Sequence, residues 1–299
     1  MPNTAPNTRP WGSLTAASAS YLIWGLFPIY WRLLKAVDAL ELITHRVVWS
    51  LLFLLIVVAA QKRLPEFRQA FTAKNIGVHA MSGGLLTINW LVYVWGVNAG
   101  HVIECSLGYF LVPLLNVILG RWLLHEKLRR VQISAIALAT FGVAVMIWQA
   151  GRPPWIALAL AATFSLYGLL RKRSSLGPLM GLTMETVLLL PFAGAFLVWL
   201  AAHQRGALGH VSPALTLMIL STGVVTAIPL LLFAKGARGL RMVTLGLLQY
   251  LAPTCQFLLG WAWYGEPMSA ARASAFSLIW AGLALYSMDA LLASRKPRA

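Results

Sequence analysis

Acidic residues are scarce in this chain. Only 8 of its 299 residues are Asp or Glu, against 24 Lys or Arg, and the formal net charge is +16. Such an excess of positive charge in a soluble protein points to nucleic acid. Here, however, the basic residues form short clusters between long apolar segments, and no basic domain stands apart. That distribution is typical of membrane topology, so we expect no nucleic-acid partner.

Cysteines and the motifs of common enzyme classes are also lacking. The two cysteines, Cys105 and Cys255, lie inside apolar segments, where a small buried thiol is the simplest interpretation, and this excludes a disulfide framework or a cysteine metal site. The sequence has no GxSxG, HExxH or GxxxxGK[ST] motif. We therefore expect no enzymatic activity, no metal, no cofactor and no direct use of ATP by this chain.

Apolar residues dominate the composition. They make up 59% of the chain, charged residues 11%, and the mean hydropathy is +0.74. One soluble core cannot bury this much apolar surface, so the lipid bilayer is the expected surrounding. Because a hydrocarbon layer of roughly 30 Å needs about 20 apolar residues in a helix, the sequence predicts an all-α integral membrane protein with ten transmembrane helices. The expected spans are residues 11–31, 40–60, 78–97, 102–123, 131–149, 155–170, 179–200, 214–234, 242–263 and 271–292.

The basic residues orient these spans. If the N-terminus and the even-numbered connections lie on one side, that side holds 18 of the 24 Lys and Arg residues and the other side holds 5, while Arg46 lies within a span. Positive residues mark the cytoplasmic side. Both termini are therefore predicted to be cytoplasmic.

The chain contains an internal repeat. A shift of 140 residues superposes prolines, glycines and glutamates of the fourth span and its following connection on those of the ninth: Pro113 and Pro253, Gly120 and Gly260, Glu126 and Glu266. The repeat, residues 1–150 and 151–299, is five spans long. Because five is odd, the second copy enters the membrane from the opposite face, and such inverted repeats are typical of secondary transporters.

Three segments resemble a known family. They are YLIWGLFPIYW at 21–31, ELITHRVVWS at 41–50 and ECSLGYFLVP at 104–113, and they are similar to the RarD branch of the EamA family in the drug/metabolite transporter superfamily. The resemblance covers nearly the whole chain and is more specific in the first half. It implies a permease of the bacterial inner membrane with a central cavity, without identifying its substrate.

Ionisable residues inside spans are functional candidates, because they are costly there unless paired or hydrated. Arg46 and Glu104 both fall in the outer half of the bilayer and are predicted to form an ion pair, either as a buried salt bridge that fixes helix register or as a substrate contact or gate. Glu185 falls in the inner half, where Lys235 or Arg238 is the expected partner. Burial could keep the Glu185 carboxyl neutral, so this residue is a candidate proton site.

Polar and aromatic side chains follow single faces of several predicted helices. The fourth span carries Tyr109 and Asn116, and its repeat counterpart carries Gln249 and Gln256; on the third span Asn89 and Tyr93 share a face. These residues are predicted to line the cavity. Three aromatic residues are candidates for stacking on a substrate, with packing or interfacial anchoring as the alternative: Trp24, Trp90 and Tyr167.

Other charged residues have a structural interpretation. Glu126 and Glu266 each precede a span and are expected to cap the helix that follows, and the clusters at 171–173 and 295–298 are expected to anchor the chain near anionic lipid. Together these features predict a secondary transporter that moves a small organic metabolite or drug outward by alternating access. The rival is a membrane sensor or interaction protein with a permease fold. A proton is a candidate coupling ion, and a homodimer is allowed.

Overall fold

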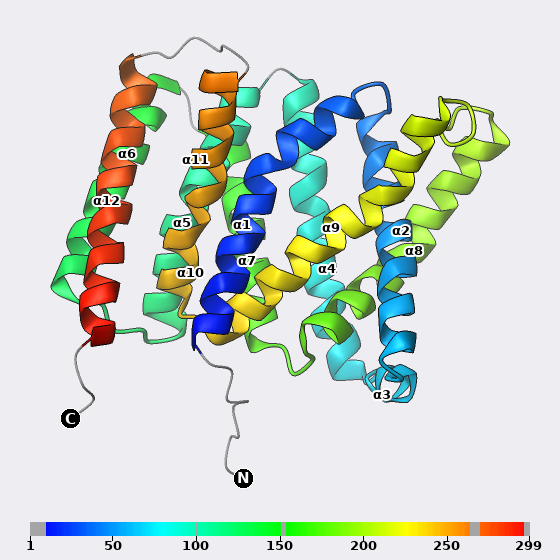
Figure 1. Cartoon of the computed structure of the whole chain (residues 1–299), viewed down its shortest axis with the longest axis horizontal. Helices are drawn as coiled ribbons and strands as arrows, with labels where there is room; N and C mark the ends of the chain where they lie inside the picture. The colour runs from blue at the N-terminus through cyan, green and yellow to red at the C-terminus, as the bar shows by residue number, and fades with distance from the viewer. Residues whose placement is uncertain (1–9, 100, 151–153, 264–269, 296–299) are drawn as a thin grey trace.

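The computed structural model describes residues 10–99, 101–150, 154–263 and 270–295 (Figure 1). Within these ranges every regular element is helical. The helices are α1 (Pro10–Leu33), α2 (Ala39–Ala60), α3 (Leu64–Gln69), α4 (Ala73–Asn98), α5 (Val102–Leu123), α6 (Arg130–Ala150), α7 (Trp155–Arg173), α8 (Pro178–Ala202), α9 (Pro213–Gly239), α10 (Met242–Gln249), α11 (Leu251–Leu258), a π-helical turn η1 (Leu259–Trp263) and α12 (Ala270–Arg295).

The predicted apolar segments coincide with these helices, with one interruption. The segment at 242–263 is divided near Tyr250 into α10 and α11, because Pro253 has no N–H to donate to the carbonyl one turn earlier. Taken alone, four helical segments of the described chain are long and apolar enough to cross a membrane: Ala39–Ala60, Pro178–Ala202, Pro213–Gly239 and Met242–Trp263.

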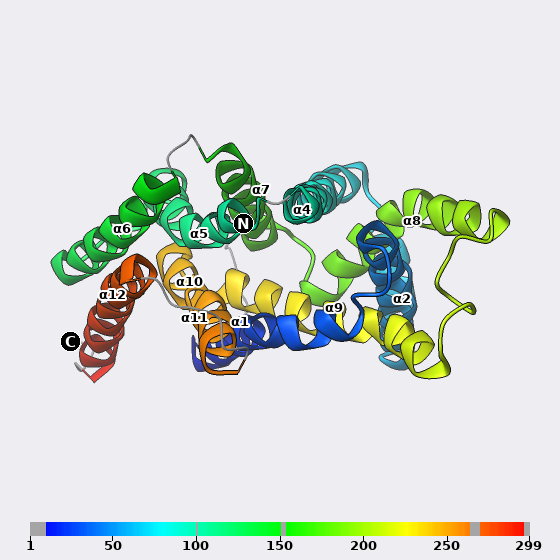
Figure 2. The ribbon, with the colours of Figure 1, turned by 90° about the horizontal axis from the view of Figure 1, so that it is seen from above.

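The helices stand side by side in two rows (Figures 1 and 2). One row contains α6, α5, α7 and α4, and the other contains α12, α10 with α11, α1 and α9. At one end α6 packs on α12, and at the other end α2 packs on α8 and α9. Contacts of α5 with α10 and of α7 with α9 join the two rows between these ends. The cavity described below lies between the rows.

One edge of the molecule collects the basic connections, and we call it the basic edge. At the lower side of Figure 1, α1 begins and α12 ends, and the connections α2–α4, α5–α6, α7–α8 and α9–α10 lie there as well. These connections carry the predicted basic clusters, including Arg171, Lys172 and Arg173 at the end of α7. The opposite edge, formed by the α1–α2, α4–α5 and α8–α9 connections, is the outer edge.

A short helix, α3, lies at the basic edge and was not predicted. It is amphipathic, with Phe67 buried against Val58 and Met180. On its exposed side the Arg63 guanidinium donates to both carboxylate oxygens of Glu66 at 2.6 Å, and this hydrogen bonding lowers the pKa of the Glu66 carboxyl. Six residues of mixed polarity are too few to give a clear periodic pattern in a sequence.

Glu126 caps a helix, but not the one expected. Its carboxylate accepts hydrogen bonds from the Met242 and Val243 amides at 2.7 and 3.1 Å, so it caps α10 in the other half of the chain instead of α6, which follows it. A Cβ atom at Gly120 would approach the Glu126 carboxylate to 2.8 Å, which shows how closely α5, this carboxylate and α10 are packed. The corresponding Glu266 lies outside the described residues. The sequence predicted the chemistry of the cap and missed its long-range partner.

Candidate functional site

A cavity of ≈ 260 Å³ lies between the two rows of helices. Residues of α1, α2, α4, α5, α7, α9, α10 and α11 line it. They are mostly aromatic or apolar, with a few polar groups: Tyr21, Trp24, Phe27, Pro28, Trp31, Arg46, Leu86, Asn89, Trp90, Tyr93, Tyr109, Phe164, Leu230, Gln249, Ala252, Pro253 and Gln256. An apolar pocket with a small number of placed polar groups is the usual form of a small-molecule site.

Most of the residues singled out from the sequence meet at this cavity. Eight line it: Trp24, Arg46, Asn89, Trp90, Tyr93, Tyr109, Gln249 and Gln256. Three lie elsewhere: Asn116 is buried beside Gln249, Tyr167 lies within an aromatic cluster, and Glu185 lies in a separate polar cluster. The side chain of Glu104 is outside the described residues, so its pairing with Arg46 stays a prediction.

Arg46 is the one charged side chain among the described residues that line the cavity. Its Nε donates to Thr226 Oγ1 of α9 at 2.9 Å. The guanidinium carbon lies 4.1 Å from the ring centroid of Trp90 and 4.9 Å from that of Trp31, within the range of cation–π attraction. One hydrogen bond and two aromatic rings therefore fix the orientation of this guanidinium. Its charge makes the electrostatic potential in this part of the cavity positive.

Amide side chains supply the neutral polar groups. Asn89 Nδ2 donates to the Leu160 carbonyl oxygen at 2.8 Å and to Thr163 Oγ1 at 2.9 Å, so it links α4 to α7. Gln256 Nε2 donates to the Trp24 carbonyl oxygen at 3.1 Å. Because these NH₂ groups are engaged by the protein, the amides contribute mainly their carbonyl oxygens to a bound molecule.

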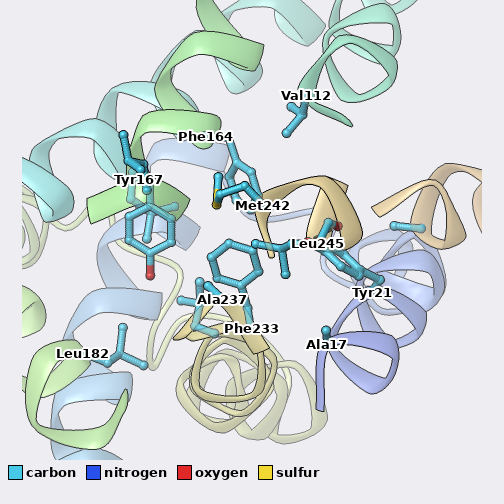
Figure 3. Close-up of a cluster of buried hydrophobic side chains, with 14 of the residues drawn as sticks. Ala17, Tyr21, Val112, Phe164, Tyr167, Leu182, Phe233, Ala237, Met242 and Leu245 are labelled. Carbon is cyan, nitrogen blue, oxygen red and sulfur yellow. Dashed lines mark hydrogen bonds between the residues drawn. The ribbon is translucent and has the colours of Figure 1, made fainter. Parts of the chain in front are cut away.

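An aromatic cluster, which we call the aromatic floor, adjoins the cavity and shares Tyr21, Trp24 and Phe164 with its lining. Phe233 and Tyr167 (Figure 3) lie nearer the basic-edge ends of α9 and α7 than the lining residues Leu230 and Phe164 do. Phe233 of α9 lies at its centre and contacts four other rings, those of Tyr21, Trp24, Phe164 and Tyr167. Tyr167 stacks on Phe233 with 5.8 Å between ring centroids and 13° between planes. Tyr167 is therefore packed into the floor and is not among the residues that line the cavity.

The partner predicted for Glu185 was wrong. Its carboxylate contacts Arg171 Nη1 of α7 at 3.2 Å, and both side chains are buried. Lys235 is exposed, and Arg238 donates instead to the carbonyl oxygens of Ser174 and Leu176. The sequence groups Arg171 with Lys172 and Arg173 as a lipid anchor, because it cannot show which member of a basic run turns inward.

Comparison with known proteins shows the family of this chain. The model of the EamA-like transporter family matches residues 10–148. Over nearly the whole length, the chain is 41% identical to "Protein RarD" of Salmonella typhimurium, with 94% of this chain and 96% of that protein covered. The chain belongs to the EamA-like transporter family. It is a multi-pass membrane protein, and the family resemblance found in its sequence is confirmed.

Other relatives are similar to this chain at the same level. One is an "Uncharacterized transporter" of Pseudomonas aeruginosa, 44% identical with 93% of each chain covered, and another is the "Uncharacterized transporter YojE" of Bacillus subtilis, 42% identical with 91% and 92% covered. A solved structure, described only as "Crystal structure of protein", superposes with a TM-score of 0.70 at 20% identity, covering 95% of this chain and 99% of that one. That likeness supports the fold alone.

Several residues of the site were not found from the sequence. Trp31 and Phe164 line the cavity, Thr226 positions Arg46, and His79 contacts Glu185. Aromatic and hydroxyl residues are common in apolar spans, so none of these stood out by type. His79 carried the clearest available signal, since an ionisable ring near the start of the third span is unusual, but nothing in the sequence paired it with Glu185.

Proposed function

We propose that this chain is a secondary transporter that moves a small organic anion outward across the bacterial inner membrane by alternating access through the central cavity. The observation that carries the proposal is Arg46, a cation held by Thr226, Trp31 and Trp90 at the wall of a largely aromatic cavity. Two observations support transport over an enzymatic role: the chain belongs to a family of transporters, and a few polar side chains line its otherwise apolar cavity. No cofactor is required for this cycle.

The cavity chemistry favours an amphipathic substrate. A guanidinium is a bidentate donor that matches the geometry of a carboxylate, and the surrounding rings suit an apolar or aromatic body. The carbonyl oxygens of Asn89 and Gln256 add hydrogen-bond acceptors for a hydroxyl or amine group. A volume of ≈ 260 Å³ suits a compact metabolite. We therefore expect a small monocarboxylate with a ring or a branched apolar chain.

The helix contacts support two inverted five-helix repeats. If α1, α2, α4, α5 and α6 correspond to α7, α8, α9, α10–α11 and α12, then most of the large helix contacts have a counterpart under exchange of the halves, although the contact of α7 with α9 has no comparable counterpart between α1 and α4. The contact of α1 with α9 corresponds to that of α7 with α4, and α5 with α7 corresponds to α11 with α1. The contacts α2 with α8, α5 with α10 and α6 with α12 map onto themselves. A two-fold axis in the membrane plane produces this pattern.

The proposed topology has ten crossings with both termini in the cytoplasm. Its support is the 18 to 5 distribution of basic residues and the collection of the basic connections at one edge of the molecule. The aromatic floor lies between the cavity and this edge, so the arrangement suits a conformation with the cytoplasmic side closed. We further propose that a proton gradient drives the transport. A homodimer stays a prediction.

The rival function is a sensor that binds a ligand without moving it. Purified protein tested with phenylacetate and with the neutral phenylacetamide separates charge from shape: the acid should raise the melting temperature, because a ligand of the folded state stabilises it, and the amide should not. Arg46→Gln should abolish the effect, and Arg46→Lys should retain part of it. Movement of labelled phenylacetate into proteoliposomes then distinguishes a transporter from a sensor. Equal stabilisation by acid and amide would contradict the anionic substrate.

A further inference from the structure

A buried polar cluster lies between the aromatic floor and the basic edge, outside the central cavity. It joins His79 of α4, Arg171 of α7 and Glu185 of α8, each 1% exposed. Ser82 Oγ donates to Glu185 Oε1 at 2.6 Å, and His79 Nδ1 lies 3.2 Å from the same oxygen. Helices from both halves of the chain therefore meet at a single carboxylate.

The geometry assigns the histidine tautomer. His79 Nδ1 faces Glu185 Oε1 at 3.2 Å and Arg171 Nη1 at 3.4 Å. An ionised carboxylate only accepts hydrogen bonds, so the shorter contact is satisfied when Nδ1 carries its proton and donates to Glu185, while Arg171 Nη1 donates to the same carboxylate. Nε2 is then the free acceptor of the neutral ring, and it lies 2.9 Å from the Ser174 hydroxyl oxygen.

The Ser174 hydroxyl can serve both charge states of the ring. When His79 is neutral, Ser174 donates its proton to Nε2. When Nε2 is protonated, it donates to Ser174 Oγ, and the serine proton turns to the Leu176 carbonyl oxygen, 3.4 Å away. No donor or acceptor of this pair loses its partner in either state, whereas a buried unpaired group would cost free energy.

Protonation of His79 would add one positive charge to this cluster. Arg171 and Glu185 compensate each other, so a neutral His79 leaves the trio neutral. Among the described residues, three further polar or charged groups lie near this trio. Tyr167 of α7 is near Glu185, and Arg238 of α9 donates to the Ser174 and Leu176 carbonyl oxygens. Arg46 of α2 lines the same small cavity as Glu185. The Glu185 carboxylate favours a protonated His79, and the nearby arginines oppose it.

A small cavity connects this cluster to the transport site. It has a volume of ≈ 20 Å³ and is lined by Glu185, Arg46 and Thr226, among others. Glu185 Oε2 is buried and has no hydrogen-bond partner among the described residues. A space of this volume admits one water molecule, which would supply that oxygen with a donor and link the carboxylate to the Arg46 region.

We propose that His79, with Ser174 and Glu185, is the proton-binding site of this protein, filled from the basic edge through the α7–α8 connection and coupled through Glu185 to the cavity of Arg46. The proton adds to Nε2 and returns from it, with no other bond made or broken. The binding of a proton here is independent of the proposed transport, whereas its role as the coupling ion rests on that function. Gly181 supports the site, because a Cβ at this position would overlap Arg171.

Solid-state NMR of the full chain in lipid bilayers, labelled with ¹³C,¹⁵N-histidine, tests the site directly. The chain has six histidines, and replacing the other five with Gln leaves His79 as the single labelled ring. We expect this ring to change from neutral to charged as the sample is acidified. Glu185→Gln should move the midpoint down by one pH unit or more, because the carboxylate favours the charged ring. In the chain with all six histidines, His45→Gln, which removes another buried histidine, should leave the His79 midpoint unchanged.

A ring that stays neutral down to pH 5, or a midpoint unaffected by Glu185→Gln, would overturn the proposal. The coupling is tested by adding saturating phenylacetate, whose charge at Arg46 should move the midpoint to higher pH. An unchanged midpoint with bound phenylacetate would overturn the coupling. Failure of the anion to bind at all would instead contradict the proposed function, since the titration of His79 is measured without any substrate.

Discussion

Gly223 of α9 lies directly against the backbone of Trp49 in α2. A Cβ atom added at Gly223 would overlap the Trp49 carbonyl group, and Ser50 Oγ donates to the Gly223 carbonyl oxygen at 3.0 Å. Two helix backbones thus meet here without intervening side chains, as small residues permit in membrane proteins. Because α2 carries Arg46 and α9 carries Thr226, this crossing holds the two partners of that hydrogen bond together.

Gly223→Ala should destabilise the protein by about 1 to 3 kcal/mol, since the backbone of α2 must move to admit the methyl group. The melting temperature of purified protein measures this. Gly84, in α4, has open space around its Cα, so Gly84→Ala is the matched control and should be neutral or slightly stabilising. Equal effects of the two substitutions would refute the close crossing.

The buried pair of Arg171 and Glu185 should behave as a coupled unit. Arg171→Met or Glu185→Gln alone removes one partner and should cost roughly 3 to 5 kcal/mol, because it leaves an uncompensated polar or charged group. The double variant should recover much of that loss in thermal unfolding. Arg63→Gln breaks an exposed pair on α3 and serves as the control, with no measurable change expected. Additive losses in the double variant would show that the two residues do not interact.

The topology prediction can be checked with single cysteines in a chain whose two natural cysteines are replaced by alanine. Ser175→Cys, exposed in the α7–α8 connection at the basic edge, should react with an impermeant maleimide only in inverted vesicles. Gln204→Cys, exposed in the α8–α9 connection, should react in intact spheroplasts. Labelling of both positions from the same side would disprove the assigned orientation.

Pairing of Arg46 with Glu104 is a separate prediction. If the two side chains pair during the cycle, Arg46→Met or Glu104→Gln should each reduce the amount of folded protein, and the double variant should recover folding without transport. Size-exclusion profiles report folding, and proteoliposome uptake reports transport. A double variant with normal folding and normal transport would show that the pair has only a structural role. Stable single variants without transport would show that each residue acts alone.

Short-range patterns in the sequence accounted for much of the fold. Apolar segment lengths placed the helices within a few residues, and steps of three and four brought Asn89, Tyr93 and Tyr109 to the cavity. What could not be predicted depends on contacts between distant segments. The Glu126 carboxylate caps a helix 116 residues further along the chain, and Arg171 turns inward to Glu185 although its neighbours Lys172 and Arg173 are equally basic.

The interruption near Tyr250 shows the same limit. Pro253 lies within the ninth predicted span, but a proline inside a span either kinks the helix or is accommodated by packing, and its neighbours decide which. Here the break leaves the Tyr250 ring fully buried beside Phe110. Likewise, a list of aromatic residues could not separate Trp24 and Trp90, which line the cavity, from Tyr167, which packs against Phe233 below it.

The central claim is the transport of organic anions through the Arg46 cavity. The most direct test compares the small molecules released by two cell populations, one producing the wild-type chain and the other an equal amount of the Arg46→Gln variant. The account predicts that wild-type cells enrich the medium in one or more small carboxylates, and that Arg46→Gln abolishes this enrichment while Arg46→Lys retains part of it. Media that do not differ in any organic anion, or neutral compounds enriched equally by the wild type and Arg46→Gln, would contradict it.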